Sequence, residues 1–277
     1  MTAILLALGA SISWGVGDFV GGVSSRRLAT LTVLAVSEVA GFLALVVLVA
    51  VRGDDPLATG ATLAALAAGA AGLVGLGGLY QGMAVGAIGV VAPVSGLAAL
   101  VPLVYGLSRG ERPGAVQLAG ALLILAGVVL VSREPGRAGA RVAAGVGFAV
   151  LSAIGFGLYY VLIDAASEES AAWAVCVARG TASVVAVTVA AAWRAPLVAP
   201  ARMLPWLVAI GLFDAGANVL LAAALNRGYT SIVAVVASLY PVVTIVLAAS
   251  LLREHVAPLR MIGIAGALGG VALVSAG

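Results

Sequence analysis

Ten apolar runs, each about long enough to cross a lipid bilayer, follow one another along this chain of 277 residues. A helix needs about 20 mostly apolar residues to cross the hydrocarbon core. Membrane strands are shorter and alternate apolar with polar residues, which these runs do not. The pattern predicts an all-α, multi-pass integral membrane protein with ten transmembrane helices. The runs lie at roughly residues 3–23, 31–51, 60–80, 86–107, 114–131, 142–163, 171–193, 203–224, 230–252 and 257–276.

The charge content agrees with a lipid environment. Only 9% of the residues are charged, whereas soluble domains carry about 25%. All 14 basic residues are arginines, and they stand singly or in pairs between the apolar runs. Such scattered charges form no basic stripe for phosphates, so we expect no nucleic-acid partner. The expected partner surface is the lipid bilayer, and a homo-oligomer is left open.

Several chemical classes lack the residues that they need. The chain has one cysteine, Cys176, and one histidine, His255, too few for a Cys/His metal centre. It has no HExxH motif, no Ser/His or Cys/His arrangement and no phosphate-binding loop of the G-x-x-x-x-G-K-[ST] type. We therefore expect no enzyme, no catalytic residue, no metal and no cofactor.

The second half of the chain repeats the first. Sliding residues 80–132 forward by 143 positions places "GVVLVS" (127–132) on "GVALVS" (270–275). The first helices match at a shift of 140 and the second helices at 141, which places Glu38 on Arg179. We predict a five-helix repeat over 1–132, a linker over 133–141 and a second repeat over 142–277.

Five is an odd number, so the second repeat must enter the membrane from the opposite side. Many secondary transporters are inverted repeats of this kind, with the substrate near the bilayer midplane between the two copies. The repeat therefore indicates alternating access of one central site to the two sides of the membrane.

The chain resembles the EamA-type branch of the drug/metabolite transporter superfamily over nearly its whole length. The resemblance implies export of amino acids, drugs or other small metabolites across a membrane, here expected to be a bacterial plasma membrane. Two positions depart from the family pattern, because Glu38 stands where the family often has arginine and Ala98 is the repeat counterpart of Pro241. The motifs that carry the resemblance are "SWG" (13–15), Arg179, "SLYP" (238–241), "GERP" (110–113) and "REHVAP" (253–258).

Five polar residues inside the runs are the first candidates for a substrate or proton pathway. Ionisable groups in spanning helices cost roughly 3 kcal/mol each on insertion scales and are functional hypotheses by default. These residues are Asp18, Glu38, Arg179, Asp214 and Asn218.

Asp18 and Glu38 are expected at similar depth on neighbouring antiparallel helices. Two nearby carboxylates at low dielectric cannot both ionise easily, so one of them is expected to carry a proton. The alternative is that each is hydrogen-bonded within the bundle and only fixes packing.

Arg179 is permanently charged, so we expect it to have a partner: Glu38, Asp214 or an anionic group of the substrate. A purely structural ion pair is the alternative. Asp214 and Asn218 share one helix face at i, i+4 spacing and are expected to point into one cavity.

Aromatic residues are the expected lining of that cavity: Trp14, Tyr80, Tyr159, Tyr160 and Tyr240. Glu111 and Glu254 differ, because each stands just before the next helix. There a carboxylate stabilises the positive N-terminal end of a helix, so we expect both to cap the helices that follow them.

The sequence thus predicts a secondary transporter, expected to be an exporter, of a small organic solute, with proton coupling through the carboxylates. A cation channel or carrier and a non-transporting membrane scaffold are the alternatives. The two signals of orientation disagree. Nine arginines lie in the loops on the side opposite the termini, which places the termini outside, whereas the family resemblance implies cytoplasmic termini.

Overall fold

The structure is a computed structural model that describes residues 1–86, 88–131, 140–252 and 258–276. The described residues are helical apart from short connections. The α-helices are α1 (Thr2–Ser25), α2 (Thr30–Arg52), α3 (Thr59–Val85), α4 (Ile88–Gly96), α5 (Leu100–Ser108), α6 (Ala115–Val131), α7 (Ala140–Ser167), α8 (Ala171–Ala192), α9 (Leu204–Leu225), α10 (Thr230–Ala237), α11 (Tyr240–Leu252) and α12 (Pro258–Ala276), with a 3₁₀ turn, η1 (Leu97–Ala99), after α4.

Ten helical segments correspond to the ten predicted spans, because two spans are each built from two helices. Within the described residues, eight segments are long and apolar enough to cross a membrane, and α6 and α12 are shorter apolar helices. Pro113 lies in the connection before α6, and Pro258 is the first residue of α12. Since proline fits the first turn of a helix but not its interior, it sets a late start for the helix.

The two broken spans are the fourth and the ninth. The fourth is divided by η1, between Pro93 and Pro102. The ninth is divided at Ser238 and Leu239, just before Pro241. Proline removes a backbone donor and clashes with the preceding turn, and broken helices at membrane depth are tolerated where they are buried in protein or line a cavity.

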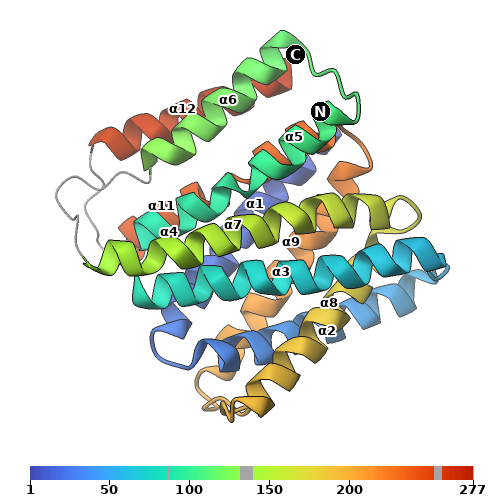
Figure 1. Cartoon of the computed structure of the whole chain (residues 1–277), viewed down its shortest axis with the longest axis vertical. Coiled ribbons are helices and arrows are strands. Elements are labelled where there is room, and N and C mark those ends of the chain that lie inside the picture. Colours follow the sequence, from blue (N-terminus) through green and yellow to red (C-terminus); the bar gives the residue numbers. More distant parts are fainter. Residues whose placement is uncertain (87, 132–139, 253–257, 277) are drawn as a thin grey trace.

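Helices from the two halves pair with one another across the molecule. α3 packs along α7, α1 along α9, α2 along α8, and α6 along α12. Figure 1 shows α6 and α12 together at one edge of the bundle and α2 and α8 near the opposite edge. Each pair joins a helix of the first half to one of the second, so the two halves share an extensive interface.

Glycine contacts in the α6–α12 pair are reciprocal. A Cβ atom at Gly120 would lie 2.7 Å from the carbonyl oxygen of Gly270, and one at Gly127 would lie 2.6 Å from that of Gly263. The shift of 143 exchanges these two contacts, as expected for two copies related by a pseudo-two-fold axis. Glycine at all four positions allows the close backbone approach that is typical of membrane helix pairs.

Glycine contacts also correct the predicted sequence shift between the first helices of the two halves. A Cβ at Gly15 would meet Val243 and the Tyr240 carbonyl, and a Cβ at Gly157 would meet Val101 and the Ala98 carbonyl. These contacts are equivalent at a shift of 142, so the shift of 140 was wrong by two residues. The same contacts pair Ala98 with Tyr240, one residue before the predicted counterpart Pro241. The matched glycines had suggested 140, but glycines recur often enough in these helices to match by chance. The corrected shift places Trp14 on Phe156 and Asp18 on Tyr160.

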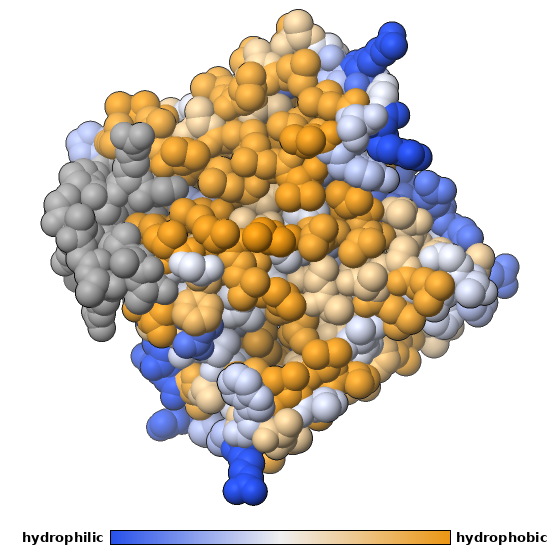
Figure 2. Space-filling model, in the orientation of Figure 1, coloured by the Kyte–Doolittle hydropathy of each residue, from blue (hydrophilic) through white to orange (hydrophobic). Residues whose placement is uncertain are grey.

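The outer surface carries the lipid-facing side chains. Large apolar residues such as Leu43, Val47 and Val184 are exposed. In the face shown in Figure 2, hydrophobic residues cover the middle of the molecule, and hydrophilic residues gather toward the right-hand edge and the lower left. A hydrophobic band between two polar ends is the surface expected of a membrane-embedded bundle.

Glu111 caps a helix, but not the one that follows it. Its carboxylate accepts hydrogen bonds from the backbone N–H groups of Thr230 (2.8 Å) and Ser231 (3.1 Å) and from the Ser231 hydroxyl. The capped helix is therefore α10, in the other half of the chain. The prediction assumed a local cap, because no sequence pattern indicates that α5 ends beside α10. Glu254 lies outside the described residues.

Candidate functional site

A cavity of about 50 Å³ lies between the two halves. Its lining comes from α1, α2 and α3 of the first half and from α7, α8, α9 and α11 of the second. A single water needs about 10–15 Å³ of such space, so the cavity has room for a few waters or a small polar group. It is lined by all eight residues predicted for the pathway, namely Trp14, Asp18, Glu38, Tyr159, Arg179, Asp214, Asn218 and Tyr240.

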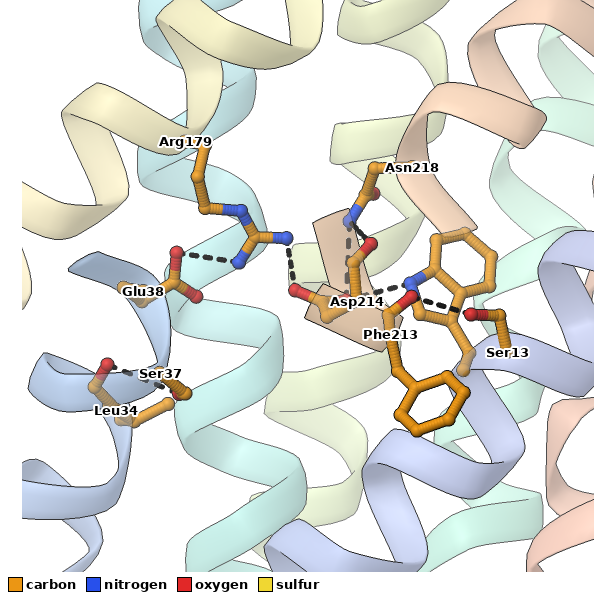
Figure 3. Close-up of polar contacts among 9 residues, drawn as sticks. Ser13, Leu34, Ser37, Glu38, Arg179, Phe213, Asp214 and Asn218 are labelled. Carbon is orange, nitrogen blue, oxygen red and sulfur yellow. Dashed lines mark hydrogen bonds and ion pairs between the residues drawn. The ribbon is translucent and has the colours of Figure 1, made fainter. Parts of the chain in front are cut away.

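A buried ion network crosses the cavity. Arg179 of α8 donates from Nη1 to Glu38 of α2 at 2.6 Å and from Nη2 to a carboxylate oxygen of Asp214 on α9. Figure 3 shows the guanidinium between the two carboxylates. Of the three partners proposed for Arg179, the structure therefore supplies two at once. Because both carboxylates are paired and all three groups are buried, the network balances much of its own charge.

Asp214 is the centre of a wider hydrogen-bond cluster. The indole Nε1 of Trp14 donates to Asp214 Oδ1 at 2.8 Å, and the amide of Asn218 donates to the Asp214 carbonyl at 2.7 Å and to Oδ1 at 3.2 Å. The neighbouring Ser13 hydroxyl donates to the Phe213 carbonyl at 2.6 Å (Figure 3). α1 and α9 are thus held together at the level of the cavity, and the Trp14 ring is fixed in orientation.

Asp18 has a different environment from the other two acids. Its side chain is 5% exposed and lines the cavity, yet it has no hydrogen-bond or ion-pair partner among the described residues. The predicted Asp18–Glu38 carboxylate pair was wrong: Arg179 holds Glu38, and the acid that acts electrostatically on Asp18 is Asp214. Helix rotation decides which face each acid presents, and depth alone could not give it.

Aromatic rings surround the same space. The ring centroid of Trp14 lies 5.9 Å from that of Tyr160 and 6.3 Å from that of Tyr240, and the Phe156 centroid lies 6.4 Å from that of Tyr240. The prediction was wrong for Tyr80, which is fully buried but does not line the cavity. Gly21 leaves the space into which the Tyr80 ring packs.

Sequence reasoning missed the apolar part of the lining. α3 contributes Gly69, Gly72, Leu73 and Leu76, and its sequence has no ionisable residue that marks it as a cavity helix. The Tyr159 ring lies 3.0 Å from where a Cβ at Gly72 would stand, so that glycine makes room for an aromatic residue of the site. The remaining lining residues are Phe156, Tyr160, Val175, Ala178 and Ala182.

Charge and ligand chemistry limit what the cavity could hold. Three carboxyl groups share it with one guanidinium, and the guanidinium lies between two of them. Among the described residues, no group of three or more His, Cys, Asp or Glu side chains is placed to hold a metal ion. The arrangement can exchange protons or bind a polar solute, and it contains no nucleophile–base pair of the kind that covalent catalysis needs.

A bundle of apolar helices with a polar cavity between two duplicated halves is an architecture of membrane transporters. The chain belongs to the EamA-like transporter family, whose sequence profile matches residues 1–133 and again residues 143–276. It is therefore a multi-pass integral membrane protein and not an enzyme.

The chain was also compared with curated proteins and with solved structures. No curated protein matches the chain. A crystal structure described only as that of a protein superposes with a TM-score of 0.79 at 19% sequence identity, over 99% of this chain and 96% of that chain. At this identity the likeness concerns the fold alone.

Proposed function

We propose that the chain is a secondary transporter that moves a small organic solute through the cavity between its two halves, by alternating access, in the direction of export. The observation that carries this proposal is the placement of the polar residues. Membrane-buried charged groups are costly, and three acids and one arginine, together with the amide of Asn218, line one space at the interface of the repeats. Inverted repeats place substrate sites at this interface.

Proton coupling follows from the unequal pairing of the acids. Glu38 and Asp214 are occupied by Arg179, whereas Asp18 lines the cavity without a partner among the described residues. An unpaired carboxyl group at low dielectric favours the uptake of a proton or a cation. Asp18 is therefore our candidate for the group that exchanges a proton with the solute during the transport cycle.

The alternatives are less well supported by this geometry. A metal-ion carrier would use the carboxylates as ligands, but a guanidinium lies between Glu38 and Asp214. A membrane scaffold has no need for an unpartnered acid in a cavity. Either alternative predicts that neutral organic solutes and amines alike fail to move with the protein.

Transport is tested in proteoliposomes that contain an internal pH dye. Pools of amino acids, nucleobases and organic cations are added outside, with wild type, Asp18→Asn and Glu38→Gln compared. Glu168→Gln is the matched control, because Glu168 is an exposed acid away from the cavity lining. We expect a solute-dependent pH change in wild type and the control that falls at least about tenfold in Asp18→Asn.

A solute flux without any pH change would contradict proton coupling but not transport. The absence of flux with every pool, in protein that remains folded and monodisperse, would contradict the proposed solute classes.

A further inference from the structure

We propose that Asp18 and the rings of Trp14, Tyr160 and Tyr240 form a binding site for an organic ammonium ion. This inference rests on the proposed function, because it names the class of solute that the cavity takes. It concerns the part of the cavity beside the Arg179 network.

Asp18 is a buried acid without a polar partner among the described residues. Asp18 is 5% exposed and lines the cavity. It has no hydrogen bond or ion pair among these residues. A buried charge is normally paired or coordinated. The structure therefore provides a strong acceptor that is aimed into an open space and has nothing to accept from.

Among the described residues, the cavity lining offers an anionic solute no unpaired cation. Arg179 is the lining residue that carries a positive charge, and its guanidinium is already shared by Glu38 and Asp214. A substrate carboxylate or phosphate would have to displace one of these carboxylates and leave it buried without a partner. An ammonium ion meets no such obstacle, because the paired arginine is balanced by its own acids.

Three aromatic rings line the cavity together with Asp18. The ring centroid of Trp14 lies 5.9 Å from that of Tyr160 and 6.3 Å from that of Tyr240. Rings attract cations over their faces, and tryptophan does so best. The indole of Trp14 is held by Asp214, so the ring need not be ordered when a ligand arrives.

The two halves differ in residue type at the position of Asp18. At the corrected shift of 142, Trp14 corresponds to Phe156 and Asp18 to Tyr160, and all four line the cavity. Both halves thus have an aromatic residue at the position of Trp14. At the position of Asp18, the first half has a carboxylate and the second half has Tyr160. Because the second half packs with a tyrosine at this position, helix packing does not require the Asp18 carboxylate. We therefore expect this carboxylate to set the charge preference of the site.

An ammonium ion and a proton compete for the same carboxylate. If Asp18 is protonated before binding, the exchange is balanced: the acid releases its proton to the solvent, and the carboxylate then pairs with the R–NH₃⁺ group. The ionisable groups that face Asp18 are Tyr80 from α3, Tyr160 from α7, Asp214 from α9 and Tyr240 from α11. Among them only Asp214 is an acid, and it is paired with Arg179.

The test uses purified protein in detergent, so that it does not depend on transport. Binding of benzylamine is measured by calorimetry and compared with that of benzyl alcohol and phenylacetate, which have a neutral and an anionic group. We expect binding of benzylamine alone, with proton release. Its affinity should fall as the pH is lowered over a range in which the amine stays protonated. In Asp18→Asn the affinity should fall on the order of thirtyfold or more, and its pH dependence should disappear.

Two further variants protect the result against misfolding. Asp18→Glu keeps the charge and should retain binding. Asp54→Asn removes an acid in the α2–α3 connection that does not line the cavity, and it should bind as wild type does. If Asp18→Asn does not fold, the comparison of the three ligands on wild type still decides. Equal binding of benzylamine and benzyl alcohol would overturn the inference.

The outcomes separate this inference from the proposed function. Flux of amino acids or other solutes in proteoliposomes, with no Asp18-dependent binding of benzylamine, would overturn the ammonium site and leave the transporter standing. Asp18-dependent binding of benzylamine without flux of any solute would support the site and contradict transport.

Discussion

Arg179 carries a charge that is buried at the interface of the two halves. It binds Glu38 and Asp214 at once, and those acids come from different helices of different halves. Breaking a buried ion network by removing one member costs more than replacing the whole network with neutral groups, because single removal leaves a charge without a partner.

Arg179→Gln is therefore expected to lower the free energy of unfolding by about 3–5 kcal/mol. The triple variant Arg179→Gln, Glu38→Gln, Asp214→Asn should lose less, since it contains no unpaired charge. Unfolding in mixed micelles by increasing SDS measures both. A single variant within about 1 kcal/mol of wild type would contradict the network's role in holding the two halves together.

Asp54 forms a pH-dependent contact with Arg52 in the α2–α3 connection. A hydrogen bond from Arg52 at 2.8 Å and, to a smaller extent, one from Ser170 lower the pKa of Asp54. The depressed pKa means that the contact stabilises the folded state above the ordinary carboxyl range, and that this contribution is lost as the pH falls through the lowered value.

The hydrogen-exchange rate in the connection that contains Asp54, divided by the intrinsic rate at each pH, should therefore be unchanged from pH 7 to about pH 5 and should increase below about pH 4. Asp54→Asn should abolish this increase. An increase that begins near neutral pH, or that persists in the variant, would show that a different group is responsible.

At the scale of elements, α10 depends on a residue from the other half of the chain. Glu111 accepts hydrogen bonds from the first N–H groups of α10, and these groups have no partner within the helix itself. The carboxylate also lies at the positive end of the helix. This contact joins the end of the fourth span to the start of the ninth.

Glu111→Gln should lower the melting temperature through the loss of a charged cap, with a change in the free energy of unfolding of about 1 kcal/mol. Glu168→Gln is the matched control and should change it by less than about 0.5 kcal/mol, because Glu168 is exposed. Equal effects of the two substitutions, measured by thermal unfolding in detergent, would argue against the cap.

Sequence reasoning was sufficient for the elements but not for their contacts. Run length and the internal repeat predicted ten helical segments in duplicated halves, because hydrophobic thickness fixes helix length. The polar residues of the site were found because a charge in an apolar run is conspicuous. Rotation, register and long-range contacts were missed: the pairing of Asp18, the shift of the first helices and the target of Glu111 all depend on how helices pack. The lining from α3 carries no charge and could not be distinguished from ordinary packing.

At the scale of the whole molecule, the described contacts between the halves at the loops gather at the end that holds both termini (Figure 1). Trp173 donates from Nε1 to the Asp54 carbonyl at 2.8 Å, and Glu169 accepts from the backbone N–H of Ala58 at 2.8 Å. At the opposite end, Thr30 donates to Gln81 at 2.7 Å within the first half. Alternating access requires the first set of contacts to break and re-form as the halves move.

The account's central claim is that the cavity opens to each side of the membrane in turn, and cysteine accessibility tests it most directly. In a Cys176→Ser background, Leu73→Cys places a thiol in the cavity lining, and a membrane-impermeant maleimide is added to either side of oriented vesicles. The account predicts labelling from both sides, at rates that a transported solute changes in opposite directions. Labelling from one side alone, with and without every solute tested, would contradict it.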